Sequence, residues 1–347
     1  MAQAESTTTG ITLWKTAKDF AAKKAVLLVL ALLVIVTGIA QPNFLSYDNL
    51  INILMITSVY VIIALGEGAI LITKGTDLSA GRVVGLTACV AASMLQRSDY
   101  ASKIFPDIPA MPLIVPILIA IVVGLIVGII NGGIVAWLKV PPFIATLGTM
   151  TIAYGAVSLY VDRPPHGASP IGGLRNDFTD VANGAIPIAG NVRLPYIIII
   201  AAVVLLLMWV ILNRTRLGKN IYAIGANPDA AEVSGVNVNK TLIIVYIIAG
   251  ALYGLAGSLQ AARQGSATNN LGYGWELDAI SACVIGGVST TGGIGTVGGM
   301  LTGVLMLTFM NNALVFLNVS PYWQNVVKGI IIVSAVAVDI RKYLKKR

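Results

Sequence analysis

Apolar runs long enough to cross a lipid bilayer recur along almost the whole chain. Of its 347 residues, 56% are hydrophobic and 11% are charged, whereas soluble domains carry about 25% charged residues. A helix needs about 20 apolar residues to cross the ~30 Å hydrocarbon core. The candidate spans lie near residues 25–40, 50–73, 78–96, 113–138, 143–161, 195–212, 241–262, 277–291, 297–317 and 322–340. The sequence therefore predicts an all-α integral membrane protein with ten transmembrane helices.

The distribution of basic residues predicts how these spans are oriented, because Lys and Arg favour the cytoplasmic flanks of membrane helices. With the N-terminus inside, sixteen of the 23 Lys and Arg, Arg82 among them, fall in inner segments, six fall in outer segments and Lys328 lies within the last span. We expect both termini in the cytoplasm: a tail over 1–24, one transmembrane domain over 25–340 with a cytoplasmic loop at 213–240, and a basic tail over 341–347. The net charge of +8 then reflects topology and anionic lipid rather than nucleic-acid binding.

Residues 213–240 form a polar, basic segment in an otherwise apolar chain. Asn227 is a favourable N-cap, Pro228 suits the first helical position and Asp229 complements the positive end of the helix dipole. Gly235 can take the left-handed conformation that ends a helix. The segment predicts a short capped helix offered to a partner, and the alternative is a surface linker with one turn. The chain contains no Gly-x-x-x-x-Gly-Lys-Ser/Thr motif, so we expect no P-loop ATP site in it.

Two short matches relate the halves of the chain. Thr87–Val90 resembles Ser281–Val284 at an offset of 194, and Leu138–Phe143 resembles Leu317–Tyr322 at an offset of 179. An extra outer loop around Arg97–Met111 accounts for the difference between the offsets. Both matches join elements five spans apart, so the related elements have opposite membrane orientations. This pattern predicts an inverted repeat, in which the substrate path lies at the repeat interface.

Two polar, glycine-containing segments interrupt the spans, at residues 73–81 and 265–278. Non-helical backbone at membrane depth is tolerated where it is buried in protein or lines a water-filled cavity. Asp77 is positioned to cap the third span, and Glu276 or Asp278 to cap the eighth. We therefore expect these carboxylates either to cap helices or to contact substrate.

Uncharged polar side chains are scattered through the apolar spans and the two interruptions. Such donors and acceptors suit a neutral polyhydroxylated solute, whereas an ion path favours rings of charge. The alternative role is hydrogen bonding between helices. The candidate substrate-path residues are Thr76, Asp77, Ser79, Asn131, Thr146, Asn269, Asn270, Asn311 and Asn312.

Glu67 is the carboxylate that lies well inside an apolar span. An ionisable group in such a position is a functional candidate by default, and proton coupling is the obvious function. Lys74 follows seven residues later, near the predicted cytoplasmic end. We therefore expect Glu67 to be paired or hydrated, and proton coupling is the alternative.

Three further features suggest chemistry that the surrounding sequence does not support. Gly293–Gly298 matches the Gly-x-Gly-x-x-Gly dinucleotide pattern without the βαβ unit that the pattern requires. We interpret it as helix packing, in which small residues four apart allow close approach. The residues with this spacing are Gly81 and Gly85, Gly124, Gly128 and Gly132, Gly250 and Gly254, and Gly295, Gly299 and Gly303. Cys89 and Cys283 are expected to be buried small hydrophobes, and the single His166 predicts no metal site.

Longer motifs carry a family resemblance from about residue 42 to residue 342. They are residues 75–82, 142–150, 216–238, 265–272, 276–280 and 321–324. On these motifs the chain resembles the permease subunits of galactose/methyl-galactoside ABC importers, within the ribose/galactose/arabinose group of sugar permeases. Glu67 departs from the small or apolar residue expected at its position, and the tail through Phe20 has no family counterpart.

The resemblance implies a non-catalytic transport subunit in a bacterial inner membrane. It implies two copies of this chain, a cytoplasmic ATPase that carries ATP and Mg²⁺, and a periplasmic sugar-binding protein, with no cofactor or metal bound by the chain itself. Residues 226–236 would be a coupling helix that docks into the ATPase. The implied coupling residues are Arg216, Gly225, Asn227, Pro228, Asp229, Ala230, Ala231, Glu232, Ser234, Gly235, Val236 and Asn237.

Alternative functions remain open at this point. The same permease role could serve ribose or another monosaccharide. A proton-coupled sugar transporter would use Glu67 as its carrier, and a membrane oxidoreductase would use the Gly293–Gly298 run to bind a nucleotide.

Overall fold

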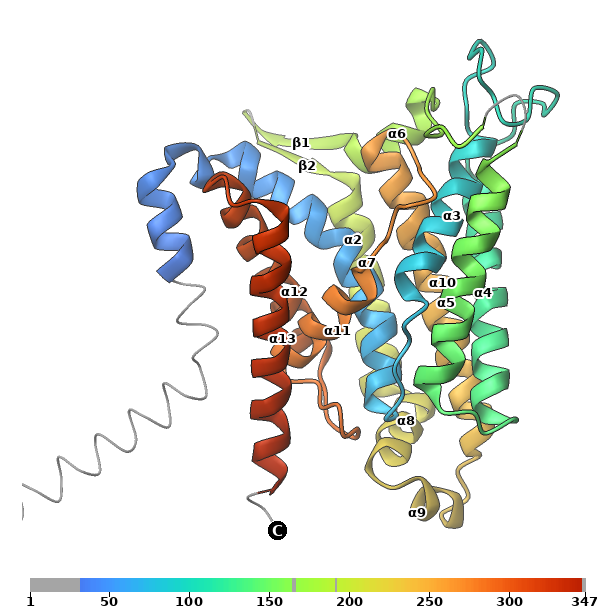
Figure 1. The fold of residues 1–347 in the computed structure, drawn as a ribbon, viewed down its shortest axis with the longest axis vertical. Helices are drawn as coiled ribbons and strands as arrows, with labels where there is room; N and C mark the ends of the chain where they lie inside the picture. Colours follow the sequence, from blue (N-terminus) through green and yellow to red (C-terminus); the bar gives the residue numbers. More distant parts are fainter. Residues whose placement is uncertain (1–31, 164–166, 191, 345–347) are drawn as a thin grey trace, which may run out of the picture.

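The computed structural model describes residues 32–163, 167–190 and 192–344 as a bundle of helices (Figure 1). Six helices in this part of the chain are long and apolar enough to cross a membrane. They are α2 (Tyr47–Ile72), α4 (Ile114–Ala136), α5 (Pro142–Val161), α7 (Tyr196–Arg214), α10 (Val238–Gln264) and α12 (Val297–Phe316). The membrane-protein class is confirmed, whereas the predicted number of ten spans is not.

Two predicted spans form helices that are too short to cross a bilayer. α3 (Ala80–Met94) has 15 residues and α11 (Trp275–Ile285) has 11. At 1.5 Å per residue they rise about 22 Å and about 16 Å, less than the ~30 Å core. Each follows one of the polar interruptions, so the third and eighth predicted spans are partial helices within the bundle.

The described residues include part of the first predicted span and all of the last. Residues 32–40 are helical and belong to the first span, whereas the tail at 1–24 lies outside the described residues. A short 3-10 helix, η1 (Pro42–Leu45), leads into α2. α13 (Pro321–Leu344) continues four residues into the predicted basic tail. The C-terminal helix is therefore longer than the hydrophobic run alone indicated.

A short β-hairpin makes the fold less than wholly helical. The segment before α7 contains α6 (Asn176–Asn183), β1 (Ala185–Ala189) and β2 (Val192–Pro195). The two strands pair antiparallel. The Tyr47 hydroxyl of α2 donates to the carbonyl oxygen of Arg193 at 2.6 Å and accepts from the Arg193 N–H at 2.7 Å. The all-α membrane class therefore holds, with one short hairpin at the opposite end of the bundle from α9 (Figure 1).

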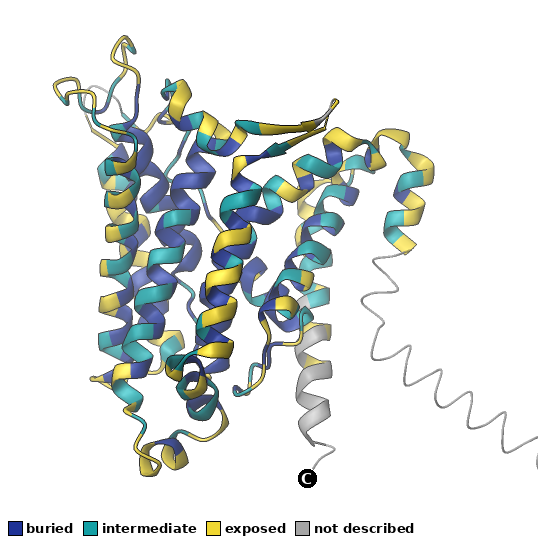
Figure 2. Ribbon diagram, turned by 180° about the vertical axis from the view of Figure 1, so that it is seen from behind, coloured by how far each residue is buried: buried dark blue, intermediate teal, exposed yellow. Residues whose placement is uncertain are grey.

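α10 lies at the centre of the bundle and packs against α2, α3 and α4. Figure 2 shows buried residues filling the interior, with exposed residues on the outer helices and at both ends. A Cβ added at Gly124 would overlap the carbonyl oxygen of Gly250, and one at Gly128 would overlap that of Tyr246. Close α4–α10 approach through glycines is therefore confirmed, because no larger residue leaves room for the facing backbone.

The cysteine prediction is also confirmed. Cys89 on α3 and Cys283 on α11 are both fully buried and unpaired. Each occupies the interior as a small hydrophobe. His166 lies outside the described residues.

Candidate functional site

The polar loop after α7 folds into two short helices, α8 (Arg216–Ala226) and α9 (Pro228–Val233). The Asn227 side-chain oxygen accepts from the backbone N–H groups of Asp229 and Ala230, at 3.0 and 3.1 Å. Pro228 occupies the first turn, and Gly235 has φ +85°. The predicted short capped helix is confirmed in its N-cap, its proline and its left-handed stop.

The sequence interpretation missed α8. Its N-cap is Thr215, whose hydroxyl accepts from the N–H of Gly218 at 3.2 Å. Ile221 and Ile224 are buried one turn apart. The signal was present as a capping threonine followed by apolar residues at helical spacing, but the polar composition of the loop obscured it.

The side chains of this loop divide into exposed and buried sets. Of the predicted coupling residues, Arg216, Asn227, Asp229, Ala230, Glu232, Ser234, Gly235 and Asn237 are exposed, Pro228 and Val236 are half-buried, and Gly225 and Ala231 are buried. Val233 was not among the predicted residues, yet it is 91% exposed at the end of α9. A fully exposed valine beside acidic and small residues is the most available apolar contact of this helix.

α8 contacts the end of α2, beside the first interruption, and the loop before α12. A Cβ at Gly225 would overlap the carbonyl oxygen of Ile72 and the backbone of Gly293. The N–H of Gly293 donates to the same Ile72 oxygen at 2.8 Å, and the Lys74 ammonium donates to the carbonyl of Ala226 at 3.4 Å. Movement of α8 would therefore act directly on the end of α2 and on the loop before α12.

The glycine run at Gly293–Gly298 belongs to this same contact. The Tyr222 hydroxyl of α8 donates to the carbonyl of Gly295 at 2.8 Å, and burial raises the pKa of that hydroxyl, which keeps it protonated. Gly299 faces the carbonyl of Gly286 too closely for any side chain. The run joins the loop to α12 without the βαβ unit of a dinucleotide site, so its packing interpretation agrees with the structure.

The two polar interruptions lie against each other inside the bundle. A Cβ at Gly81 would overlap the carbonyl oxygen of Gly272, and one at Gly85 would overlap that of Leu271. The N-terminal turns of α3 thus pack on the segment before α11, which lies nearly 190 residues later in the chain. Small residues make this contact possible because backbone meets backbone.

Arg82 lies in this contact rather than on the inner membrane flank where the charge count placed it. It is 8% exposed, and its guanidinium lies 4.3 Å from the ring centre of Tyr154 and 4.9 Å from that of Tyr273. One nitrogen donates to the Asn270 side chain at 3.5 Å. Because α3 begins within the bundle, its first basic residue is enclosed and stacked on aromatic rings.

Five of the predicted substrate-path residues lie together at the first interruption, in two hydrogen-bonded sets. The Asp77 carboxylate accepts from the N–H and hydroxyl of Ser79, at 2.8 and 2.6 Å. The Asn131 amide donates to the Ser79 hydroxyl at 2.9 Å, and the Thr146 hydroxyl donates to the carbonyl of Thr76 at 3.2 Å. These groups hold the first interruption against α4 and α5. Ser79, rather than Asp77, occupies the N-cap position of α3.

Glu67 joins this cluster from α2. It is fully buried, and its two oxygens accept from the N–H of Asp77 at 3.1 Å and from the Tyr253 hydroxyl at 3.2 Å. Lys74 points instead to α8. The expected pairing of Glu67 with Lys74 is therefore wrong, because the lysine ammonium reaches the end of α8 instead.

The carboxylates at the start of α11 do not cap it. Gly274 is the N-cap residue with φ +78° and makes no side-chain cap. Glu276 and Asp278 lie in the first turn, where they complement the helix dipole. Asp278 pairs with Lys328 of α13 at 3.0 Å. The capping prediction is therefore wrong for these two residues, since the left-handed glycine turns the chain into the helix.

The remaining predicted path residues lie in two places. Asn269 donates to the Ser158 hydroxyl at 3.4 Å, beside the stacked arginine. Asn311 and Asn312 line a separate cavity of about 310 Å³ between α2, α11 and α12. The buried side-chain oxygen of Asn311 has no hydrogen-bond partner among the described residues. The predicted path residues are thus divided among the cluster around Asp77, the contact around Arg82 and this cavity.

The chain is similar to known permeases over most of its length. A family model described as a branched-chain amino acid transport system permease component matches residues 49–336. The chain belongs to this permease family. It is 50% identical over 322 residues to the galactose/methyl galactoside import permease protein of Escherichia coli, with 93% of this chain and 94% of the relative covered. It is 49% identical to the protein of the same name from Haemophilus influenzae, with 95% and 97% covered. The ribose import permease protein of E. coli is 39% identical, with 91% and 93% covered. No solved structure matches the chain.

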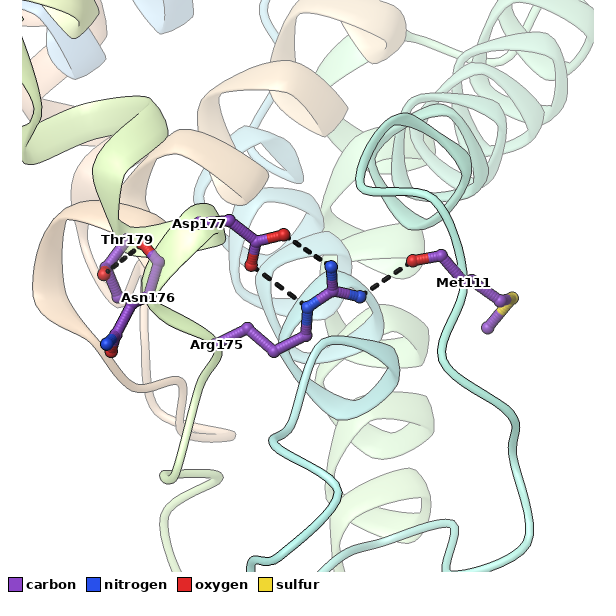
Figure 3. Close-up of polar contacts among 5 residues, drawn as sticks. All are labelled: Met111, Arg175, Asn176, Asp177 and Thr179. Carbon is purple, nitrogen blue, oxygen red and sulfur yellow. Dashed lines mark hydrogen bonds and ion pairs between the residues drawn. The ribbon is translucent and has the colours of Figure 1, made fainter.

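At the hairpin end of the permease, loops from both sides of α4 and α5 are tied together. The Arg175 guanidinium bonds the Asp177 carboxylate through two nitrogens and donates to the carbonyl of Met111 at 2.8 Å (Figure 3). A hollow of about 460 Å³ opens beside them, with Arg97 and Asp99 among its lining residues. This end therefore offers a charged, concave surface.

Substitutions of Glu67 separate a structural role from proton carriage in the permease. In a Glu67→Gln variant one oxygen remains to accept from Asp77, and the amide can donate to Tyr253, so we expect near-normal uptake. Glu67→Leu leaves the Asp77 N–H and the Tyr253 hydroxyl unpaired, and should lower the free energy of unfolding by about 1–3 kcal/mol per group. Thermal unfolding in detergent and sugar uptake measure both effects. Loss of uptake in Glu67→Gln at unchanged thermal stability would instead favour proton carriage.

Proposed function

We propose that this chain is the membrane-spanning permease subunit of an ATP-driven importer of galactose and methyl galactoside. The observation that carries the proposal is the identity of about half of all residues with galactose/methyl galactoside permeases over nearly the full length of both chains. Identity to ribose permeases is lower, at 37–39%. The amide side chains that line the cavity at Asn311 also suit a neutral sugar. Ribose or another monosaccharide is the alternative substrate.

The proposed complex contains two copies of the chain, a cytoplasmic ATPase that binds ATP and Mg²⁺, and a periplasmic binding protein. The chain has no P-loop motif, so in this proposal the partner ATPase supplies the energy. The exposed surface of α9 supports docking of the ATPase, and the hollow at the hairpin end supports docking of the binding protein. The charge bias supports a bacterial inner-membrane orientation with both termini and α9 in the cytoplasm.

We propose that α8 transmits the movement of the ATPase to the bundle. Gly225 touches Ile72 at the end of α2 and Gly293 before α12. A displacement of α9 would reach both sides of the bundle through these backbone contacts. Because a glycine packs directly against backbone at these contacts, α8 cannot move far without moving its neighbours. The end of α2 and the loop before α12 would therefore shift with α8 between inward and outward states.

Ten spans arranged as an inverted repeat remain part of the proposal. Lys139 and Asn318, which are related by the 179-residue offset, both have φ +55°. α5 and α13 follow these two residues and run in opposite directions (Figure 1). Cys89 and Cys283, which are related by the other offset, are both fully buried. A shared rare backbone conformation at matched positions supports common ancestry of the halves.

Reconstitution tests the proposed function. Vesicles containing the permease, its ATPase and its binding protein should accumulate galactose only when ATP is supplied inside, and a proton ionophore should leave uptake unchanged. Vesicles with the permease alone should not accumulate sugar. Uptake by the permease alone that collapses with the ionophore would contradict the proposal, and preferred uptake of ribose would replace galactose as substrate.

A further inference from the structure

The cavity between α2, α11 and α12 has the size and the walls of a small-molecule site. Its volume of about 310 Å³ lies at the small end of the range for ligand pockets, roughly 300–1,000 Å³. Three helices that pack on one another form its walls, so its shape does not depend on a loop. One wall carries Tyr60, whose ring lies 4.9 Å from that of Trp275.

The polar groups of the cavity suit an uncharged ligand. The Asn311 side-chain oxygen is buried and lacks a partner among the described residues, which costs free energy unless a ligand or water donates to it. Asp278 also lines the cavity, but its charge is matched by Lys328 at 3.0 Å. An aromatic face beside neutral amides and a compensated carboxylate fits the apolar face and the hydroxyl groups of a hexose.

The cavity lies on the hairpin side of the cluster around Asp77. At its upper edge Asn312 and Asn49 exchange side-chain amide hydrogen bonds of 3.0 and 3.2 Å. α2 lines the cavity with Asn52, Ile56 and Tyr60, and only further along the same helix does Glu67 contact Asp77. A solute that enters from the hairpin end would therefore meet this cavity before it meets the cluster around Asp77.

We infer that this cavity is a hexose-binding subsite in which the Asn311 oxygen accepts a hydrogen bond from a sugar hydroxyl. The inference rests on the proposed sugar-import function. The other two amides of the lining, Asn52 and Asn312, are held in place by Arg263 and Asn49, so they form a preorganised frame. Asn311 is then the group whose partner the sugar supplies.

Protection of an introduced thiol tests the subsite directly. An Asn311→Cys variant, assembled with its ATPase and binding protein, is treated with a water-soluble methanethiosulfonate reagent with and without galactose. Cys89 and Cys283 are fully buried, so the unsubstituted complex serves as the labelling background. Saturating galactose should slow labelling of the variant by about threefold or more, because an occupied site excludes the reagent, while mannitol should not. Equal labelling rates in a complex that transports galactose would overturn the inference.

A matched pair of variants on α12 tests the contribution of Asn311 to transport. Asn311→Leu removes the acceptor and fills the cavity, and the control Thr302→Leu changes an exposed residue whose hydroxyl bonds Gly299 of its own helix. The apparent KM for galactose should rise roughly three- to tenfold in Asn311→Leu alone, the size expected for one uncharged hydrogen bond. Asn311→Ser should recover part of the loss. Equal KM values in the two leucine variants would contradict the inference, whereas absence of galactose uptake by the unsubstituted complex would instead contradict the proposed function.

Discussion

A Val233→Asp variant is expected to abolish ATP-driven uptake while the permease folds normally. Val233 is 91% exposed, so its replacement removes little packing within the chain. If α9 docks into a groove of the ATPase, the same position becomes buried, and an unpaired carboxylate there costs free energy. A loss of about 2 kcal/mol or more, typical of a central interface contact, corresponds to a roughly 30-fold weaker complex. Co-purification of the ATPase and sugar-stimulated ATP hydrolysis measure the effect.

Two controls separate docking from general damage. Leu138→Asp places the same charge on another exposed apolar residue, 70% exposed in the turn between α4 and α5, at the same end of the bundle as α9 (Figure 1). Val233→Ile keeps the apolar contact. Both should retain the ATPase. Normal co-purification and uptake by Val233→Asp would show that α9 is not the coupling element.

Val233 is a better target than two residues within the predicted coupling segment. Ala231 is only 5% exposed, so a bulky replacement there would disturb packing within the chain. Gly235 has φ +85°, and any other residue would strain the backbone. Either change could impair transport without reporting on docking.

Replacement of Gly124 by leucine should prevent the permease from folding. A Cβ at Gly124 would overlap the Gly250 carbonyl oxygen, and a leucine would also need space where α4 and α10 touch. Overpacking of a core costs about 1–3 kcal/mol, and more where backbone rather than side chain must move. We expect a marked loss of monodisperse protein in detergent and a lower unfolding temperature, measured by size-exclusion chromatography and thermal unfolding.

Gly148→Leu on α5 is the matched control. A Cβ at Gly148 meets nothing within 4 Å, and a leucine there would point away from the bundle. The two variants share one chemical change in similar apolar helices and differ in the facing backbone. Equal yields and stabilities for both variants would show that close α4–α10 approach is not required.

The short helix α9 could be predicted because the residues that determine it act locally. Asn227, Pro228 and Gly235 each act on backbone within a few residues, through a side-chain cap, a missing N–H and a left-handed turn. Val233 was not named as a coupling residue because the feature that distinguishes it is the exposure of its side chain. Exposure depends on what the rest of the chain covers, and no motif records it.

The partners of buried polar groups could not be predicted in the same way. Glu67 was expected near Lys74, and Arg82 on the membrane flank. Glu67 instead accepts hydrogen bonds from Asp77 and Tyr253, and Arg82 stacks on Tyr154 and Tyr273. In each case at least one partner comes from a distant part of the sequence, and the choice follows from how the helices cross.

Sequence by itself determined the membrane class, the capped helix at Asn227 and the glycine faces of α4 and α10. Each depends on a short stretch of chain: an apolar run as long as the bilayer is thick, a side chain that caps nearby backbone, and small residues four apart. Only the tertiary structure decided that the interruptions before α3 and α11 meet and that Gly225 of α8 contacts Ile72 and Gly293. It also decided that Asn311 lines a cavity with its side-chain oxygen unpaired. These contacts join segments up to about 260 residues apart, and their geometry depends on the simultaneous packing of all the helices.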